Sequence, residues 1–463
     1  MARAREDRNL AVRLGGAVAL FLLLVGQAQV TVLDGSSMLA VAHSLVHHGS
    51  FAVPAPLGVE GHDGLYYSKY GLLLPLLSVV PVALVQPIGL ITGRVDLLEA
   101  AAAASLMPLI CGALAAALFL LGRRLGAPRA AAALVGVGAV LGTYVLPYGR
   151  DFFTEPLVAL GLVVMVERAL ARRPLQAGVA LALAVLARPQ SAAFAPLLLA
   201  YLALRDGGDV RAAARAVPPL AVAAVVTVAY NLYRFADPLQ FGYRPPADPG
   251  FTTPLLEGSS GLLFSPAKSV FLFAPALVLV PFAVAALWRG RRAVALFVLA
   301  VCAVTWGLAA TWWSWQGGWS WGPRLVIPAV VLALALVAPW IGSSGARMRA
   351  AALLFAVGFL ISLPAVLAPA GAQLLTAPGG DGPQIVRQVR DLPALTRHSV
   401  DAARGTAARA DDYRRYLGIW QAGITRQFGP WGLIPALLGT LLLLATLVFV
   451  SRPLSFATTT GGK

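Results

Sequence analysis

An acidic side chain, Asp34, directly follows the first long apolar segment of the sequence. A carboxylate at a membrane surface can take a proton from a hydroxyl group that acts as a nucleophile. Ionisable groups at such a depth are costly, which makes them candidates for a functional site. We therefore interpret Asp34 as a candidate general base. Because Gly35 follows it, a turn or capping role is the alternative.

Other charged residues also stand where apolar segments end, and Lys69 closes the polar stretch that Asp34 opens. The residues at segment ends are Arg150, Asp151, Glu155, Arg188 and Arg324. Each one alone can be a snorkelling or helix-capping charge. The predicted topology brings all of them to one face of a membrane, which favours a shared site. An arginine there can bind phosphate through its planar fork.

Aromatic residues gather at the same predicted face. Five tryptophans fall within the ten residues 312–321, close to glycines and to Arg324. A belt of aromatic residues at the membrane interface is the simpler interpretation. The density exceeds what a belt needs, and indole rings can stack on the C–H faces of sugars. The sequence therefore predicts a sugar-binding surface here.

Two histidines, His43 and His47, are four residues apart and share one face of a predicted helix over 36–49. Ser36 or Ser37 can cap that helix and Gly49 can end it. The histidine spacing suits zinc, but the sequence shows no third ligand at motif spacing. We predict polar interfacial histidines and no cofactor, with a metal as the less favoured alternative. Both cysteines of the chain, at 111 and 302, lie in apolar runs and are interpreted as small buried hydrophobic residues.

The composition indicates what must position these groups. The chain has 463 residues, of which 59% are hydrophobic and 12% charged, against about 25% charged residues in soluble domains. Many apolar runs are long enough to cross a bilayer. The sequence therefore predicts an all-α, polytopic membrane protein. The net charge of +16 is mostly arginine. In a membrane protein such an excess normally lies in cytoplasmic loops. We therefore expect membrane lipid, and not nucleic acid, as a partner.

The positive-inside rule orients the chain. Arginines before a first span at 10–33 place the N-terminus in the cytoplasm and Asp34 outside. About twelve spans follow, and both termini are cytoplasmic in a cell inner or plasma membrane. The later predicted spans and half-spans are 97–121, 130–149, 156–171, 175–187, 190–204, 214–231, 269–287, 293–312, 325–341, 349–369 and 431–450.

Residues 71–92 are apolar enough to span but carry three prolines, which bend helices. If this stretch crossed the membrane, every later arginine cluster would lie outside. We therefore predict a bent juxtamembrane or re-entrant segment within a long outer loop, 31–96. Residues 1–370 form the transmembrane catalytic module in this interpretation. Residues 371–430 form an outer helical cap or loop, and 431–463 a last span with a cytoplasmic tail.

These features resemble the GT-C membrane glycosyltransferases, and more narrowly the group of protein O-mannosyltransferases and lipid A aminoarabinose transferase. The resemblance covers most of residues 1–340. It is carried by the acidic residue after the first span, the long first loop, the second acidic turn and three short stretches. These stretches are Tyr66-Tyr-Ser-Lys-Tyr70, Gly261-Leu-Leu-Phe-Ser-Pro266 and Trp319-Ser-Trp-Gly-Pro-Arg324. Many family members have two adjacent acidic residues where Asp34 stands alone, and many carry a soluble C-terminal domain.

The resemblance implies inverting transfer of one sugar, mannose or arabinose, from a polyprenyl-phosphate donor on the outer face. The acceptor is an envelope glycan, lipid or protein. Asp34 is the implied general base. The implied donor-phosphate ligands are Lys69, Arg188 and Arg324. The implied acceptor-binding or second acidic residues are Arg150, Asp151 and Glu155. The implied sugar contacts are Tyr66, Tyr67, Trp313 and Trp319.

Other functions remain open from the sequence. A lipid-linked sugar flippase or transporter would need polar groups at the membrane midplane and often shows internal repeats. The chain has one broken segment, at Arg188-Pro189, and no sequence repeat. A lipid-binding scaffold or an O-antigen-type polymerase or ligase is a third class, which a lipid-monophosphate-sugar donor would argue against.

Overall fold

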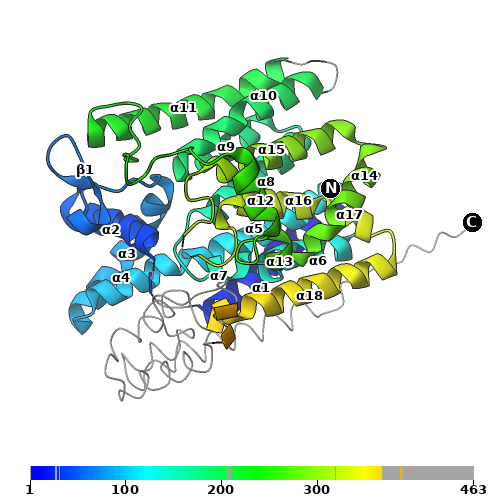
Figure 1. Ribbon diagram of the computed structural model, residues 1–463, viewed down its shortest axis with the longest axis horizontal. Helices are drawn as coiled ribbons and strands as arrows, with labels where there is room; N and C mark the ends of the chain where they lie inside the picture. The colour runs from blue at the N-terminus through cyan, green and yellow to red at the C-terminus, as the bar shows by residue number, and fades with distance from the viewer. Residues whose placement is uncertain are drawn as a thin grey trace, which may run out of the picture.

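Apolar helices make up most of the chain in the computed structural model (Figure 1). The structure describes residues 2–367 except 27, 28, 31, 206, 207, 209 and 319, together with 386–387 and 389–390. The described part confirms the predicted all-α class. The predicted cap at 371–430, apart from those four residues, and the predicted last span and tail at 431–463 lie outside it.

The first half of the chain carries most of the polar site residues. Its elements are α1 (Ala2–Leu24), α2 (Leu33–His48), η1 (Ala55–Leu57), β1 (Val59–Glu60), β2 (Tyr66–Tyr67), α3 (Leu73–Thr92), α4 (Val95–Ala104), α5 (Leu106–Arg124), α6 (Arg129–Leu141), α7 (Val145–Tyr148), α8 (Glu155–Leu170), α9 (Pro174–Ala187), η2 (Pro189–Phe194) and α10 (Ala195–Leu204).

The second half is built from helices joined by longer loops. Its elements are α11 (Val210–Phe235), α12 (Leu255–Phe264), α13 (Val270–Phe273), η4 (Pro275–Leu279), α14 (Val280–Trp288), α15 (Arg292–Thr311), η5 (Arg324–Val326), α16 (Ile327–Ala335), α17 (Val337–Ile341) and α18 (Gly345–Leu367). A helix therefore lies in every predicted span up to 367.

Six helices in the described part are long and apolar enough to cross a membrane. They are Leu73–Thr92, Val95–Arg124, Val210–Phe235, Arg292–Thr311, Arg324–Ile341 and Gly345–Val366. Further apolar helices of 10–17 residues accompany them. Helices suit such apolar stretches because they satisfy their own backbone groups where no water can.

Helices α1 and α5 pack antiparallel through small residues. A Cβ added at Gly15 would lie 2.6 Å from the carbonyl oxygen of Gly112, a close approach of the kind that glycines permit in membrane helices. Arg123 Nε, at the end of α5, donates to Asp7 Oδ2 near the start of α1 at 3.0 Å. The segment between α1 and α5 therefore starts and finishes at the other end of this pair.

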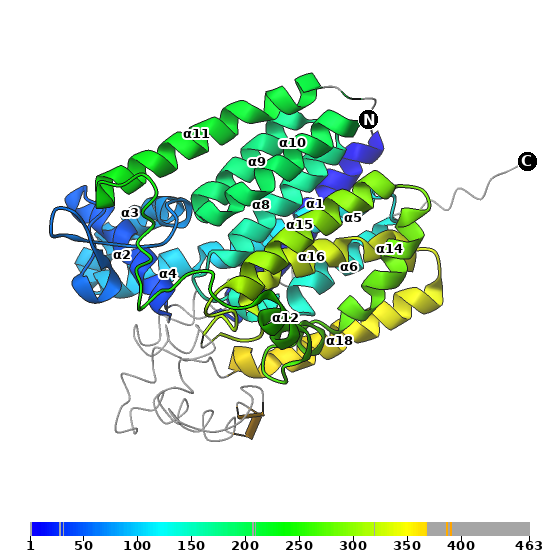
Figure 2. The same cartoon turned by 45° about the horizontal axis from the view of Figure 1, so that its top comes forward.

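Helices α2, α3 and α4 gather at that end of the molecule, as Figures 1 and 2 show. Within the predicted bent segment 71–92, residues 73–92 form the single helix α3, which contains Pro81 and Pro87. Helix α4 packs back along it. Helix α2 ends at Gly49, which is left-handed with φ 61°, as predicted. The predicted cap at Ser36 or Ser37 is wrong, because α2 begins earlier and Asp34 lies in its first turn.

A small antiparallel hairpin interrupts the polar loop between α2 and α3. Strand β1 pairs with β2 in the register Val59 with Tyr67 and Glu60 with Tyr66. The Tyr67 ring is buried and packs edge-on against Tyr233 of α11. The hairpin therefore joins the loop to α11 and fixes the course of residues 68–72, which lead to the site.

Candidate functional site

Asp34 and Arg324 meet across the molecule. Arg324 Nη1 donates to Asp34 Oδ2 at 2.9 Å, which joins the first turn of α2 to the start of η5. Both side chains are partly covered, with exposed fractions of 26% and 16%. Burial raises the pKa of the Asp34 carboxyl, but Arg324 and a hydrogen bond from Tyr70 outweigh it, so that the pKa is lowered from its ordinary value. Asp34 is therefore an ionised carboxylate at neutral pH.

A second carboxylate, Glu155, connects two arginines. Its side chain is only 3% exposed, and its Oε1 accepts from Arg188 Nη1 at 3.1 Å. The same oxygen lies 3.8 Å from Arg324 Nε. Glu155 occupies the first turn of α8, where the helix dipole favours a negative charge. The result is a chain of alternating charges, Asp34, Arg324, Glu155 and Arg188.

One nitrogen of the Arg324 guanidinium has an unused hydrogen-bond donor. Its Nε is buried and makes no hydrogen bond to any residue that the structure describes. The guanidinium lies 5.0 Å from the centre of the Phe153 ring. A buried cation with an unused donor is a suitable ligand for an anion that enters the site.

A cavity of about 330 Å³ opens beside these charges. Lys69 and Arg188 both contribute to its wall, and Lys69 Nζ donates to Asp248 Oδ2 at 2.6 Å. The cavity is otherwise largely aromatic and apolar. Its lining residues include Tyr70, Thr154, Pro189, Gln190, Phe241, Tyr243, Phe251 and Trp312. A mainly apolar cavity with a few polar groups is typical of a ligand site.

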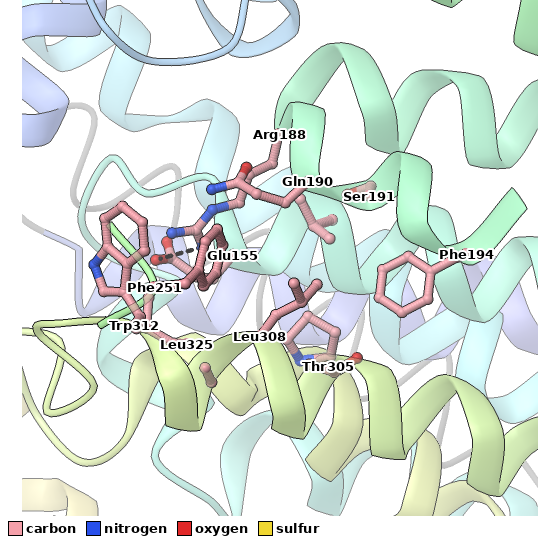
Figure 3. A pocket seen from close by; sticks show the side chains of 13 residues that line it. Glu155, Arg188, Gln190, Ser191, Phe194, Phe251, Thr305, Leu308, Trp312 and Leu325 are labelled. Atoms are coloured by element: carbon pink, nitrogen blue, oxygen red, sulfur yellow. Dashed lines mark hydrogen bonds and ion pairs between the residues drawn. The ribbon is translucent and has the colours of Figure 1, made fainter. Parts of the chain in front are cut away.

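A second pocket continues from this cavity between η2 and α15. The two share Arg188, Gln190, Phe251 and Trp312 in their walls. Figure 3 shows Arg188 and Glu155 facing one another, with Phe194 and Thr305 on the side away from Trp312. The pocket therefore runs from the charged groups toward apolar side chains of the helical bundle.

The loop that carries Arg324 is held by a buried lysine that the sequence reasoning did not select. Lys268 Nζ donates to the carbonyl oxygens of Gly318 and Gly322, each at 3.2 Å, and to that of Ser320. Burial, with Arg324 nearby, lowers the pKa of Lys268 to about 7. A lysine within the otherwise apolar run after α12 was the available signal.

Two residues predicted to bind the acceptor or to act as a second acid, Arg150 and Asp151, have backbone partners. Arg150 is 2% exposed, and its Nε donates to the Val25 carbonyl at 2.5 Å while Nη1 donates to that of Ala365 at 3.4 Å. Asp151 Oδ1 accepts from the backbone of Phe152 at 2.8 Å. The structure does not bring Arg150 into the Asp34 group, because its guanidinium binds backbone carbonyls at the ends of α1 and α18. Glu155 is the member of this turn that joins the group.

The residues predicted to contact the sugar do not lie together at the cavity. The Tyr67 ring is 1% exposed and its hydroxyl donates to Asp63 at 2.6 Å, so this ring has no free face for a sugar. Tyr66 pairs with Glu60 in the hairpin, away from both pockets. Trp313 is 39% exposed, and its backbone donates to Gly250. Trp319 lies outside the described residues.

Three aromatic residues that were not selected lie at the site. Trp312 lines both pockets, and Tyr243 and Tyr70 line the larger one. Tyr70 also donates to Asp34. Tyr70 closes the Tyr66–Tyr70 motif and Trp312 opens the tryptophan run, so both carried a sequence signal. Spacing alone does not show which ring of each motif faces the cavity.

His43 and His47 share a carboxylate partner, Glu99. Glu99 of α4 lies with its Oε2 2.7 Å from His43 Nδ1 and its Oε1 2.7 Å from His47 Nε2. The sequence reasoning found no third ligand because Glu99 is 52 residues from His47. This group lies in the last turns of α2, at the opposite end of the helix from Asp34.

Comparisons with known proteins identify the fold. No protein-family model matches the chain, and no curated protein matches it. Among solved structures, it resembles ArnT from Cupriavidus metallidurans bound to undecaprenyl phosphate, with 14% identity and a TM-score of 0.56 over 95% of this chain and 77% of that one.

A second similar structure is the archaeal oligosaccharyltransferase AglB from Archaeoglobus fulgidus in complex with an inhibitory peptide and a dolichol-phosphate. The identity is 12% and the TM-score 0.49, over 93% of this chain and 59% of that one. The likeness to ArnT shows that the chain shares its transmembrane fold. ArnT is an aminoarabinose transferase of the kind named in the sequence resemblance, and the fold of this chain agrees with that resemblance.

Proposed function

We propose that the protein is an inverting glycosyltransferase that moves one sugar from a polyprenyl-phosphate donor to a hydroxyl group of an envelope acceptor. The observation that carries this proposal is the Asp34–Arg324–Glu155–Arg188 chain of charges beside a ligand-sized cavity. It offers a base for the acceptor and cations for the leaving phosphate within one site.

Asp34 is the base of the reaction. Its carboxylate takes the proton of the acceptor hydroxyl while the acceptor oxygen forms a bond to the anomeric carbon. The bond from that carbon to the phosphate oxygen breaks on the opposite side, and the lipid phosphate leaves with the electron pair. The configuration at the anomeric carbon is thereby inverted.

The arginines stabilise the charge that appears on the phosphate. Arg324 has a free Nε donor and Arg188 lines the cavity, so both can bind phosphate oxygens. Lys69 contributes a third positive charge from the cavity wall. When Arg324 turns toward the phosphate, Asp34 loses part of its ion pair and becomes more basic. The site's own cations supply this stabilisation, and the scheme needs no metal at the reaction centre.

The smaller pocket is suited to the prenyl chain. It begins at Arg188 and continues along Phe194 and Leu308, so a phosphate at the arginines would have its lipid tail beside apolar side chains. Arg188 has an extended backbone because Pro189 follows it, and this break between α9 and η2 leaves room at the bundle surface. The solved ArnT structure, which shares this fold, contains undecaprenyl phosphate.

The remaining site residues serve the sugar and the acceptor. Glu155 positions both arginines, and Asp151, four residues before it in the chain, is kept as a candidate acceptor-binding or second acidic residue. Trp313 and Trp319 remain candidate sugar contacts, and Trp312 joins them because it lines both pockets. Mannose and arabinose are the favoured sugars, and an envelope glycan, lipid or protein is the acceptor.

The site belongs at the outer face of the membrane. About twelve spans, both termini in the cytoplasm and a catalytic module over 1–370 make up this topology. The antiparallel packing of α1 and α5 supports it, because Arg123 and the N-terminal residues share one end while 25–105, with Asp34, lies at the other. The arginine-rich end then faces the cytoplasm, and the loop 31–96 lies outside.

Transfer by the purified protein tests this function. The protein in lipid is given radiolabelled polyprenyl-phosphate mannose or arabinose and a crude envelope extract as acceptor, and the label on the acceptor is counted. Label transfer by the wild type, lost in Asp34→Asn, is the expected result. Donor binding without transfer for either sugar, in the presence of every acceptor fraction, would instead favour a lipid-linked sugar transporter.

A further inference from the structure

Three potential metal ligands converge on one point at the far end of α2. His43 and His47 come from successive turns of α2, and Glu99 comes from α4. One donor atom from each lies within 4.8 Å of the other two. The two imidazole rings lie 4.2 Å apart and both face the carboxylate. This cluster is separate from the Asp34 group, because it lies in the last turns of α2 and Asp34 lies in the first.

The burial of Glu99 makes the cluster more than a surface contact. Its side chain is 3% exposed, and the ion partners that the structure describes for it are these two histidines. A buried carboxylate needs a compensating positive charge. A divalent cation between the three groups would supply it and satisfy all three donors.

The geometry needs little change to accept zinc. Tetrahedral zinc with bonds of about 2.0–2.1 Å places its ligand atoms roughly 3.3 Å apart. The present donor atoms, at 2.7 Å in the two histidine–carboxylate contacts and within 4.8 Å overall, bracket that spacing. The exposed fractions of His43 and His47, 39% and 20%, leave an approach for the ion and for a water molecule as fourth ligand.

An outer group supports one of the ligands. The Gln86 side-chain nitrogen Nε2, on α3, lies 3.3 Å from His47 Nδ1. The oxygen and nitrogen of such an amide are assigned from their surroundings. With the amide turned over so that its oxygen takes the place of Nε2, the amide would accept the Nδ1 proton and leave His47 Nε2 unprotonated toward the cluster. This is the usual arrangement behind a metal-bound histidine.

We propose that His43, His47 and Glu99 form a zinc site that fastens α2 to α4. The donor set of two imidazoles and one carboxylate suits zinc and not the hard cations magnesium and calcium, which take oxygen ligands. The metal holds the C-terminal turns of α2 against α4, while Gln86 joins α3 to the same point. The helix whose first turn carries Asp34 is thus fixed at its other end.

Zinc binding to the full-length protein in lipid nanodiscs tests the site directly. The protein is stripped with a chelator and titrated with zinc in competition with a chromophoric chelator, and bound metal is counted by mass spectrometry. One zinc per chain is the expected result, with a higher melting temperature for the zinc form than for the stripped form. Magnesium at the same concentration is expected to produce neither effect.

Variants locate the ion. Glu99→Gln and His47→Gln are expected to weaken zinc binding by more than the roughly 10- to 100-fold that loss of an outer group costs. Gln86→Leu is expected to fall within that range. Asp96→Asn is the matched control, because Asp96 is an exposed carboxylate one turn earlier on α4, and its zinc affinity should equal that of the wild type.

X-ray absorption of the zinc-loaded wild type gives a test that needs no variant to fold. Two imidazoles and oxygen ligands at about 2.0–2.2 Å are expected. A wild type that binds no stoichiometric zinc would overturn the proposal. So would equal affinities for Glu99→Gln and Asp96→Asn, or a spectrum without imidazole scattering. None of these results depends on glycosyl transfer.

Discussion

Arg324 donates a 2.9 Å hydrogen bond to Asp34 although the two residues are 290 positions apart in the chain. The contact joins the first turn of α2 to the loop before α16. It places the proposed base and a proposed phosphate ligand in direct contact, so that donor binding and the basicity of Asp34 are linked. The first three predictions follow from this contact and its neighbours.

Replacement of Arg324 should weaken donor binding. We expect Arg324→Met to lower the affinity for polyprenyl phosphate by about 10- to 100-fold, because charge-assisted hydrogen bonds contribute about 1.5–3 kcal/mol. Arg324→Lys should recover only part of this, since lysine lacks the planar fork. Binding of radiolabelled undecaprenyl phosphate to protein in nanodiscs measures the effect.

Arg347→Met is the control for that experiment, because Arg347 is exposed and stacks on Trp340. Its donor affinity should match the wild type. If Lys69→Met, Arg188→Met and Arg324→Met all retained wild-type affinity, the phosphate-binding role of these cations would be rejected.

Loss of the Glu155 charge should destabilise the fold. Glu155→Gln leaves Arg188 and Arg324 close together without their shared counter-charge, and breaking a buried ion pair in this way costs about 3–5 kcal/mol. Thermal unfolding in detergent measures the loss. The double variant Glu155→Gln with Arg188→Met should be more stable than the single one. The control is Glu257→Gln on α12, an exposed carboxylate, and an equally small effect at both positions would contradict the account.

The pH dependence of the reaction should reflect the ion pair of Asp34. Burial raises the pKa of the Asp34 carboxyl. Arg324 and Tyr70 together lower this pKa by more, so that it lies below the ordinary value of 3.8. The base form therefore persists as the pH falls and is lost only below that value. We expect kcat/KM, which reports the free enzyme, to show no titration of Asp34 between about pH 5 and about pH 7.

The pH profile of Arg324→Met can be compared with that of the wild type. Arg324→Met removes the main group that lowers the pKa, so the burial effect remains and the acid limb should move to higher pH. The ion pair's contribution to stability is likewise present above the ordinary pKa and lost as the pH falls through the lowered one. An acid limb that stayed in place in Arg324→Met would show that a different group titrates.

Most of the fold could be predicted from the sequence because hydropathy and arginine placement carry it. Each predicted span up to 367 contains a helix, and Gly49 ends α2 as expected. The start of α2 was predicted at the wrong residue. Serine capping gave the signal at 36–37, whereas the helix begins at Leu33 without a side-chain cap. In its first turn, Asp34 makes a tertiary contact with Arg324. Local helix propensity carries no information about such a contact.

The site was predictable where charge at the end of an apolar segment was the signal. Asp34, Glu155, Arg188 and Arg324 were selected on that basis and do meet. The same signal failed for Arg150, because a buried guanidinium can be satisfied by backbone carbonyls that no sequence pattern reveals. Lys268 and Glu99 were missed because each acts on an element distant in the chain.

Lys268 gives a prediction about the loop before Arg324. Lys268→Met removes the donor to three backbone carbonyls, and a buried polar group without its partner costs about 1–3 kcal/mol. We expect faster amide hydrogen exchange across 314–323 and weaker donor binding through a displaced Arg324. Hydrogen exchange by mass spectrometry measures the first effect. Exchange equal to the wild type would show that Lys268 does not hold the loop.

The most direct test of the central claim is single-turnover transfer by Asp34→Asn. Asparagine keeps the size of the side chain and a hydrogen-bond acceptor but cannot take the acceptor proton. With donor saturating and donor binding checked separately, the account predicts a rate about 10²- to 10⁴-fold below the wild type, while Asp237→Asn, at an exposed turn, transfers normally. A wild-type rate in Asp34→Asn, with donor bound, would contradict the assignment of Asp34 as the base.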